Sequence, residues 1–203
     1  LTIDSTGKAT FTVDASINSV NIGKGANSVS GNTVLGENAL DASVTGTNNT
    51  AIGKDTLTLL TSGSNNTAIG SEALADNTTG SFNIAIGRQA LKDNTTADNN
   101  VGIGRAALGL NTTGTQNVAV GALALDANTT AGNNTAIGYN TLSANETGGN
   151  NTAVGRNALA ANTTGGNNTA VGKNALDSCT TGGNNTALGE SAAATVSTGV
   201  QNV

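Results

Sequence analysis

The sequence predicts an all-β protein, a parallel β-solenoid (β-roll) of 17-residue coils. The motif Asn-Asn-Thr-Ala-Ile-Gly, seen at residues 65–70, recurs along most of the 203-residue chain, and its glycine returns every 17 residues through nine steps. A strict period of this kind is typical of stacked repeats. Seventeen residues are too few for a pair of helices, and the motif alternates with a period of two, as a strand does. The glycines that mark the period are Gly36, Gly53, Gly70, Gly87, Gly104, Gly121, Gly138, Gly155, Gly172 and Gly189.

Each coil can be numbered from its motif glycine, which we call position 0. Position −1 is always Ile, Val or Leu, −2 is Ala in eight of ten coils, −3 is Thr, Val or Ile, and −4 is always Asn. Position +3 is Ala in eight coils and +4 is Leu in nine. Two coils give the representative repeat residues, namely Asn66, Ala68, Ile69, Gly70 and Leu74, and Asn134, Ala136, Ile137, Gly138 and Leu142.

The alternation within the motif predicts a role for each position. Because large apolar residues usually face a core, we expect positions −1 and −3 to point inward and Ala at −2 to face a neighbouring chain. Asn at −4 should form a ladder of side-chain amides from coil to coil, and Gly at 0 should lie at a bend. Each coil is expected to hold two short strands and two turns, with coils stacked about 4.8 Å apart into a thin rod.

Residues 1–17 precede the repeat, and their pattern predicts a cap for the first coil. Leu1 and Ile3, and then Phe11 and Val13, alternate with polar residues, and the stretch between them favours a turn. This pattern indicates a β-hairpin or short strand pair that covers the first coil, since the ends of a solenoid need atypical covers.

The repeat domain is predicted to span residues 18–203. Its first unit differs, because the step from Gly23 to Gly36 is only 13 residues. We therefore expect a shortened first coil at 18–35, followed by regular coils. Residues 201–203 match the opening of another repeat, which predicts further coils.

Composition excludes several classes of function. Thirteen acidic and eight basic residues give a net charge of −5, which disfavours binding to nucleic acid, and no apolar run is long enough for membrane insertion. The chain has no His, the commonest general base and metal ligand, so we expect no enzyme, catalytic residue, cofactor or metal site. Cys179 is the single cysteine and stands at a position that is usually Asn in the other coils, so it is interpreted as a structural substitution.

Three further patterns each have a functional and a structural interpretation. Charged residues at +1 are interpreted as a solvated column, with a receptor-facing stripe as the alternative; they are Glu37, Lys54, Arg88, Arg105, Arg156, Lys173 and Glu190. Asn-X-Thr sequences such as 77–79 could accept glycans, but turn chemistry accounts for them. Regular Thr columns raise ice binding as an alternative, which an inward Thr at −3 disfavours.

The thin core and the small, regular Ala face predict an oligomer. The motif at 18–23 and its ten later copies resemble the head repeats of YadA-type trimeric autotransporter adhesins, although the units of those heads are shorter. The insertions Ala73-Leu74 and 77–80, and the opening residues 1–11, are instead similar to segments of phage tail fibres. Both resemblances imply a homotrimeric fibre of β-rolls, left-handed in the adhesin heads.

The expected function follows from these resemblances. The chain would be a structural fibre segment of a phage tail fibre on the virion. It would project a tip, outside this segment, that binds a host cell-surface receptor. The alternative is the head of a bacterial trimeric autotransporter adhesin, located on the bacterial cell surface and binding a host surface or matrix.

Overall fold

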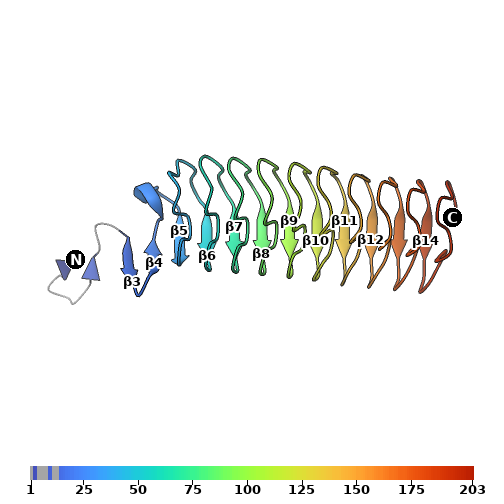
Figure 1. The fold of residues 1–203 in the computed structure, drawn as a ribbon, viewed down its shortest axis with the longest axis horizontal. Helices are drawn as coiled ribbons and strands as arrows, with labels where there is room; N and C mark the ends of the chain where they lie inside the picture. The colour runs from blue at the N-terminus through green and yellow to red at the C-terminus, as the bar shows by residue number, and fades with distance from the viewer. Residues whose placement is uncertain (1, 4–8, 11–13) are drawn as a thin grey trace.

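One short strand from each coil runs parallel to the next and builds a long sheet along one side of a rod (Figure 1). The computed structural model describes residues 2–3, 9–10 and 14–203. Each strand pairs residue for residue with the strand 17 positions away, as in Ala119 with Ala136, which confirms the predicted parallel β-solenoid of 17-residue coils. The parallel strands are β5 (Thr33–Gly36), β6 (Thr50–Ile52), β7 (Thr67–Ile69), β8 (Ile84–Ile86), β9 (Val101–Ile103), β10 (Val118–Val120), β11 (Thr135–Ile137), β12 (Thr152–Val154), β13 (Thr169–Val171) and β14 (Thr186–Leu188).

The N-terminal end of this sheet carries an antiparallel hairpin, where the sequence suggested a shortened coil. Strands β3 (Ala15–Ile17) and β4 (Val20–Gly23) pair with each other, and β4 pairs antiparallel with β5. Asn18 and Ser19 link them with φ of 49° and 65°, as a two-residue hairpin turn requires. A single 3-10 turn, η1 (Ala26–Ser28), then leads to β5. The hairpin pairs with the N-terminal edge of the parallel strands, which would otherwise be open to another chain.

A separate two-stranded sheet precedes the hairpin. Strands β1 (Thr2–Ile3) and β2 (Ala9–Thr10) are antiparallel, with Thr2 opposite Thr10 and Ile3 opposite Ala9. The predicted strand pair is therefore present. The predicted turn at 4–8 and the apolar residues Leu1, Phe11 and Val13 lie outside the described residues.

Each coil contains one strand, so the expectation of two strands per coil is wrong. After the glycine, positions +2 and +4 both take positive φ, for example 60° at Glu72 and 50° at Leu74, which breaks any extended run. The backbone still pairs between coils there: Glu72 N donates to Lys54 O at 2.9 Å and Leu74 N to Ala90 O at 3.1 Å. Inter-coil hydrogen bonds thus extend beyond the sheet and around the coil.

The core is a narrow column of Leu and Ala, and this corrects the predicted faces. Leu74 at +4, Ala73 at +3 and Ala68 at −2 are fully buried, whereas Ile69 at −1 and Thr67 at −3 are only half-buried. The alternation was correct but its phase was reversed: Ala faces the interior, and Ile and Thr face outward. A one-residue change of phase moves every side chain of a strand to the other face.

The Leu side chains explain why small residues predominate at −2. Gly102 occupies this position in one coil, and a Cβ placed on it would lie 3.2 Å from Cγ of Leu91 and 3.0 Å from the carbonyl oxygen of Ala107. A larger side chain would overlap this packing, so the column accepts Ala and excludes Ile.

Two ladders of buried Asn residues line the interior. At −4, Asn66 accepts a hydrogen bond on Oδ1 from the backbone N of Asn83, and its Nδ2 donates to Gly80 O. The predicted ladder is confirmed, although these Asn residues face the interior and not a partner chain. The second ladder, at +7, links amide to amide between coils, from Asn94 to Asn77 at 3.0 Å and onward to Asn162.

Cys179 ends the second ladder. Its thiol is buried at +7 and contacts the carbonyl oxygen of Gly182, and burial raises its pKa. Oδ1 of Asn162, one coil earlier, is buried without a hydrogen-bond partner in the described structure. This burial agrees with the interpretation of Cys179 as a structural residue.

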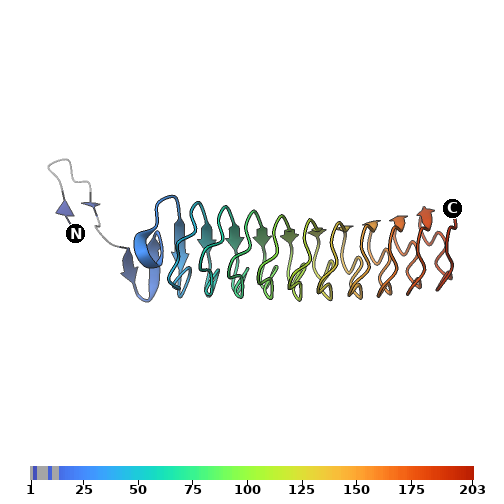
Figure 2. The same cartoon turned by 90° about the horizontal axis from the view of Figure 1, so that it is seen from above.

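The motif glycine lies at a close approach between coils. Gly70 has a φ of +126°, and a Cβ on it would lie 2.7 Å from the carbonyl carbon of Gly87. No other residue could occupy this bend without displacing the next coil. Successive coils are also rotated relative to one another, as the changing orientation of the strand arrows shows (Figure 2).

Candidate functional site

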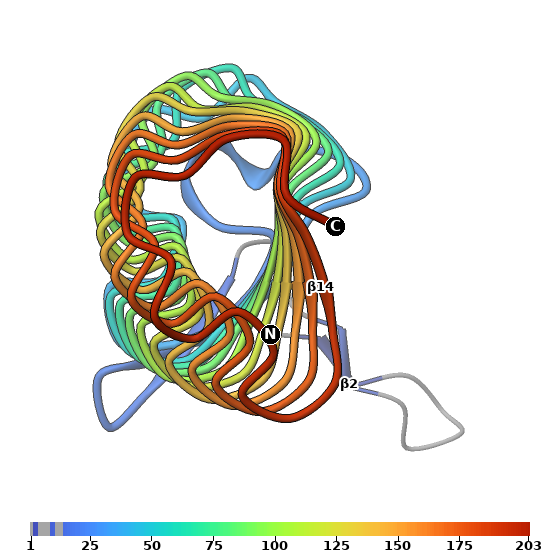
Figure 3. The same cartoon turned by 90° about the vertical axis from the view of Figure 1, so that its right-hand side faces the viewer.

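The outward side of the parallel strands is the most extensive distinctive surface of the chain, and we call it the sheet face. It consists of positions −1 and −3 of the ten coils and carries no charge. Position −1 is aliphatic throughout: Leu35, Ile52, Ile69, Ile86, Ile103, Val120, Ile137, Val154, Val171 and Leu188. Viewed along the rod, the strands fan out on one side (Figure 3). The sheet face is thus an uninterrupted, partly exposed apolar stripe.

Position −3 divides the sheet face into three zones. It is Thr in seven coils, namely Thr33, Thr50, Thr67, Thr135, Thr152, Thr169 and Thr186. Among the described residues, none of these seven hydroxyls hydrogen-bonds to another protein group. The three coils between them carry Ile84, Val101 and Val118, which lie side by side on β8, β9 and β10.

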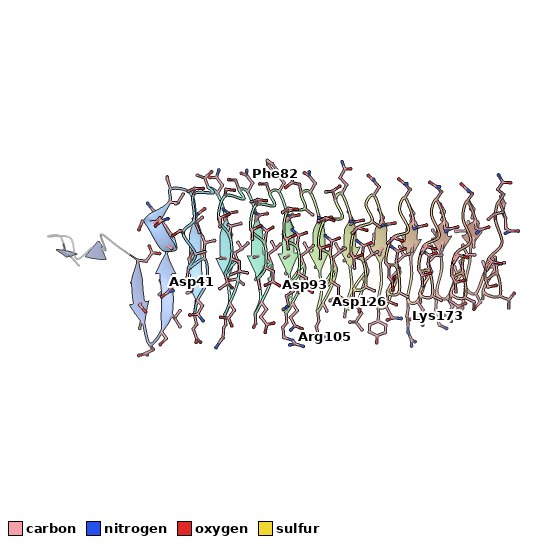
Figure 4. The ribbon with its side chains drawn as sticks, turned by 45° about the horizontal axis from the view of Figure 1, so that its top comes forward. Asp41, Phe82, Asp93, Arg105, Asp126 and Lys173 are labelled. Atoms are coloured by element: carbon pink, nitrogen blue, oxygen red, sulfur yellow. The ribbon has the colours of Figure 1, made fainter. Side chains whose placement is uncertain are left out.

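One exposed aromatic residue borders the aliphatic zone. Phe82 is 58% exposed, lies at position −5 with a φ of 59°, and stands on the same coil as Ile84 and Ile86, which are 39% and 36% exposed. Figure 4 shows Phe82 projecting from one edge of the rod. We call these residues the central patch: Phe82, Ile84, Ile86, Val101, Ile103, Val118 and Val120. Partial exposure of so many large apolar side chains in one place makes the central patch a candidate interaction surface.

The charged column at +1 is solvated, and its ion pairs join adjacent coils. Lys54 Nζ lies 3.2 Å from Glu37 Oε1, and Lys173 Nζ lies 2.7 Å from Glu190 Oε1. The first pairing raises the pKa of Lys54 and the second lowers the pKa of Glu190. Such exposed pairs contribute little to stability, so the column mainly keeps the surface charged.

A hollow interrupts the regular surface where position +5 is Gly109. It has a volume of about 350 Å³ and is lined by Gln89, Lys92, Asp93, Ala106, Gly109, Leu110 and Asp126. Lys92 Nζ already pairs with Asp93 at 2.9 Å and with Asp76 at 3.8 Å. Asp93, Arg105 and Asp126 mark this region in Figure 4.

Asp126 is the unusual group of this hollow. Its Oδ1 is buried and has no hydrogen-bond partner among the described residues. Burial raises the pKa of the carboxyl group, while backbone hydrogen bonds and the nearby Arg105 oppose the rise. The hollow combines acidic, basic and apolar groups, but the ammonium group of Lys92 already forms ion pairs with Asp76 and Asp93.

Other kinds of site find no support in the described part of the chain. It contains no group of three or more His, Cys, Asp or Glu residues placed to hold a metal ion. None of its helices is long and apolar enough to cross a membrane. Asn77 and Asn94, two of the Asn-X-Thr acceptors at +7, are fully buried and hydrogen-bonded within the coil, in agreement with a structural role. The Asn-X-Thr acceptors at −5, such as Asn65, are exposed.

Comparisons with protein-family models, with curated proteins and with solved structures gave no match. The functional interpretation therefore depends on the geometry of this chain.

The structure divides the representative repeat residues between the core, the sheet face and the bend. Of the representative residues, Asn66, Ala68, Leu74, Asn134, Ala136 and Leu142 are buried in the core. Ile69 and Ile137 lie on the sheet face, and Gly70 and Gly138 lie at the bend. The signal for the sheet face in the sequence was the substitution pattern at −3, where Ile and Val replace Thr in three adjacent coils, a mixture more typical of a half-exposed strand surface than of a packed interior.

Proposed function

We propose that this chain is a structural segment of a phage tail fibre. Three copies would pack their sheet faces together and project a receptor-binding tip that lies outside the segment. The observation that supports this proposal is the uncharged, aliphatic sheet face, which follows the whole stack and is partly exposed in a single chain. A rod of three chains would bury this stripe and provide the rigidity of a fibre.

The period of the sheet face favours a second copy of the chain as its partner. Any partner that covers the stripe along its length must present apolar groups at the coil spacing of about 4.8 Å. Another copy has the same spacing and the same twist, and it brings no charge to the contact. Three is the number of chains that the resemblance to trimeric fibre repeats implies.

The outward Thr residues favour ice binding more than the sequence suggested, because Thr at −3 faces solvent. Two features oppose this function. The Thr column is interrupted at Ile84, Val101 and Val118, and the strands rotate along the rod, whereas an ice surface is planar (Figures 2 and 3). A freezing-hysteresis assay on the chain is expected to give the value of the buffer alone.

The head of a bacterial trimeric adhesin is the second candidate, and the hollow at Gly109 is the observation that favours it. In a plain shaft every coil would present the same surface, whereas this hollow could accept a ligand on the side of the rod. In that case the segment itself would bind a host surface or matrix.

Two measurements test the proposal. Sedimentation equilibrium of residues 1–203 should give the mass of a trimer; a folded, stable monomer would contradict the oligomeric fibre. Antibodies raised against the segment should then label tail fibres in electron micrographs of virions. Labelling of bacterial surfaces, together with saturable binding of the segment to matrix-coated plates that Leu110→Asp abolishes, would instead establish the adhesin.

A further inference from the structure

We propose that the central patch sets the axial register of the associated copies. This inference rests on the proposed homo-oligomer and adds to it a specific task for Phe82, Ile84, Val101 and Val118. The problem that it solves follows from the regularity of the rod: nearly identical coils can pair in several alignments that differ by whole coils.

Position −1 cannot distinguish these alignments. It is Ile, Val or Leu at every level. If one copy moved by one coil, which is about 4.8 Å, aliphatic side chains would still meet aliphatic side chains. The column supplies attraction between copies but leaves the register open, as in any strand pairing without distinct side chains.

Position −3 can distinguish them, because its zones differ in polarity. When copies are level, Thr meets Thr, and Ile84, Val101 and Val118 meet their counterparts. A shift by one coil would place a Thr side chain opposite an aliphatic residue at both ends of the triplet. The buried hydroxyls would then lose partners that can hydrogen-bond, which is unfavourable. The triplet is therefore a register mark near the middle of the stack.

Phe82 reinforces this mark. Position −5 is Gly, Asn or Gln in the other coils of the parallel stack, and only this coil presents an aromatic ring there. The ring is exposed in the single chain and precedes strand β8, which begins at Ile84, by two residues. If the copies shifted by one coil, the large apolar ring of Phe82 would lie beside the amide side chains at −5 of the neighbouring copy.

Disulfide formation between copies can report the register. In a Cys179→Ser background, one batch carries Thr152→Cys and a second, longer by a tag, carries Thr169→Cys. The batches are unfolded, mixed, refolded and oxidised. Level copies join like positions, whereas a one-coil shift joins position 152 to position 169. A disulfide requires Cα atoms about 4.4–6.8 Å apart. Moving one cysteine by a whole coil adds about 4.8 Å along the rod, so the disulfides that form distinguish level copies from shifted copies.

The expected result is a change of register preference without loss of the oligomer. When the central patch is unchanged, disulfides between like positions should exceed disulfides between positions 152 and 169 at least about tenfold. The fourfold variant Phe82→Asn, Ile84→Thr, Val101→Thr and Val118→Thr, which gives each position the residue that seven other coils have there, should reduce this ratio to about twofold or less. It should fold, because those seven coils carry the same residues at the same positions. Ile84→Val, which keeps the triplet aliphatic, is the matched control and should behave as the unchanged patch.

The possible failures are separable. If the fourfold variant remains oligomeric and keeps the tenfold ratio, the central patch does not set the register and the proposed fibre stands. If like-position and mixed disulfides are equally abundant with the patch intact, the inference is also overturned. If sedimentation shows that the parent chain is a monomer, the proposed fibre fails and the inference fails with it.

Discussion

At the scale of single residues, the nine leucines at +4 combine an unfavourable backbone with a favourable side chain. Their φ values lie between 48° and 54°, in the left-handed region that most residues avoid. The conformation costs about 1–2 kcal/mol per residue, and full burial of a Leu side chain contributes about 1.5–3 kcal/mol. Each of these leucines is fully buried. Burial thus offsets the backbone cost, and the turn can bring the side chain into a very narrow interior.

The interrupted Asn ladder gives a prediction at the same scale. Cys179→Asn should extend the ladder by one amide and give Oδ1 of Asn162 a donor. We expect the free energy of unfolding to rise by about 1 kcal/mol, which is typical of one satisfied hydrogen bond. Chemical denaturation followed by circular dichroism measures the change. Cys179→Ala, which offers no donor, is the control, and equal stability of the two variants would show that the unpaired oxygen has no energetic consequence.

At the scale of the strand, the reversed faces separate folding from association. Ala136 is fully buried, while its neighbour Ile137 is 41% exposed on the sheet face. A small residue therefore serves the fold, and a large one is left for a partner. The sequence-based assignment gave these two tasks to the opposite residues, with Ile in the core and Ala facing the neighbouring chain.

The same substitution on the two faces tests this separation. Ala136→Asp places a charge in the core and should lower Tm by more than about 10 °C. Ile137→Asp should leave the coil folded but prevent association, because it places charges at the proposed contact between copies. Circular dichroism melting and sedimentation distinguish the two effects. An Ile137→Asp variant that melts as early as Ala136→Asp would show that position −1 is part of the core.

The strand also shows what the sequence could and could not predict. The period, the strand at 65–70, the Asn ladder at −4 and the bend at Gly70 followed from spacing and residue type. The phase of the alternation did not, because a strand of three residues offers two faces and residue size favoured the wrong one. The deciding fact was the left-handed turn that brings Leu74 and its equivalents inward and fills the space. Leu rarely adopts that conformation, so composition carried no sign of it.

The central patch was missed for a related reason. Once position −3 was assigned to the interior, Ile84, Val101 and Val118 were ordinary alternatives to Thr. On an outward face the same three residues form a distinct zone. The replacement of Thr by Ile and Val at −3 was visible in the sequence. Whether these residues formed part of the core or an exposed patch depended on which side of the strand faced solvent.

At the scale of the whole molecule, the coil is an exchangeable unit. Deletion of residues 139–155 removes one coil and joins Gly138 to Arg156 in phase. We expect Tm to stay within about 4 °C of the parent, the shift produced by about 1 kcal/mol in a chain of this size. Deletion of residues 139–156 leaves a coil of 16 residues, puts the following Leu out of phase with the core, and should lower Tm well beyond that. Similar melting of the two variants would contradict a strict 17-residue requirement.

The spacing of the inter-coil hydrogen bonds has a consequence for how the rod is made. The bonds that join one coil to the next connect residues about one repeat apart, as in Thr78 to Thr95. Parallel sheets usually fold slowly because their strands are distant in the chain, but here each strand finds its partner after a short loop closes. A ribosome that releases the chain from its N-terminus would deliver the hairpin β3–β4 before the coils, and then one coil after another. The hairpin would act as a template, and the rod would grow by addition during synthesis.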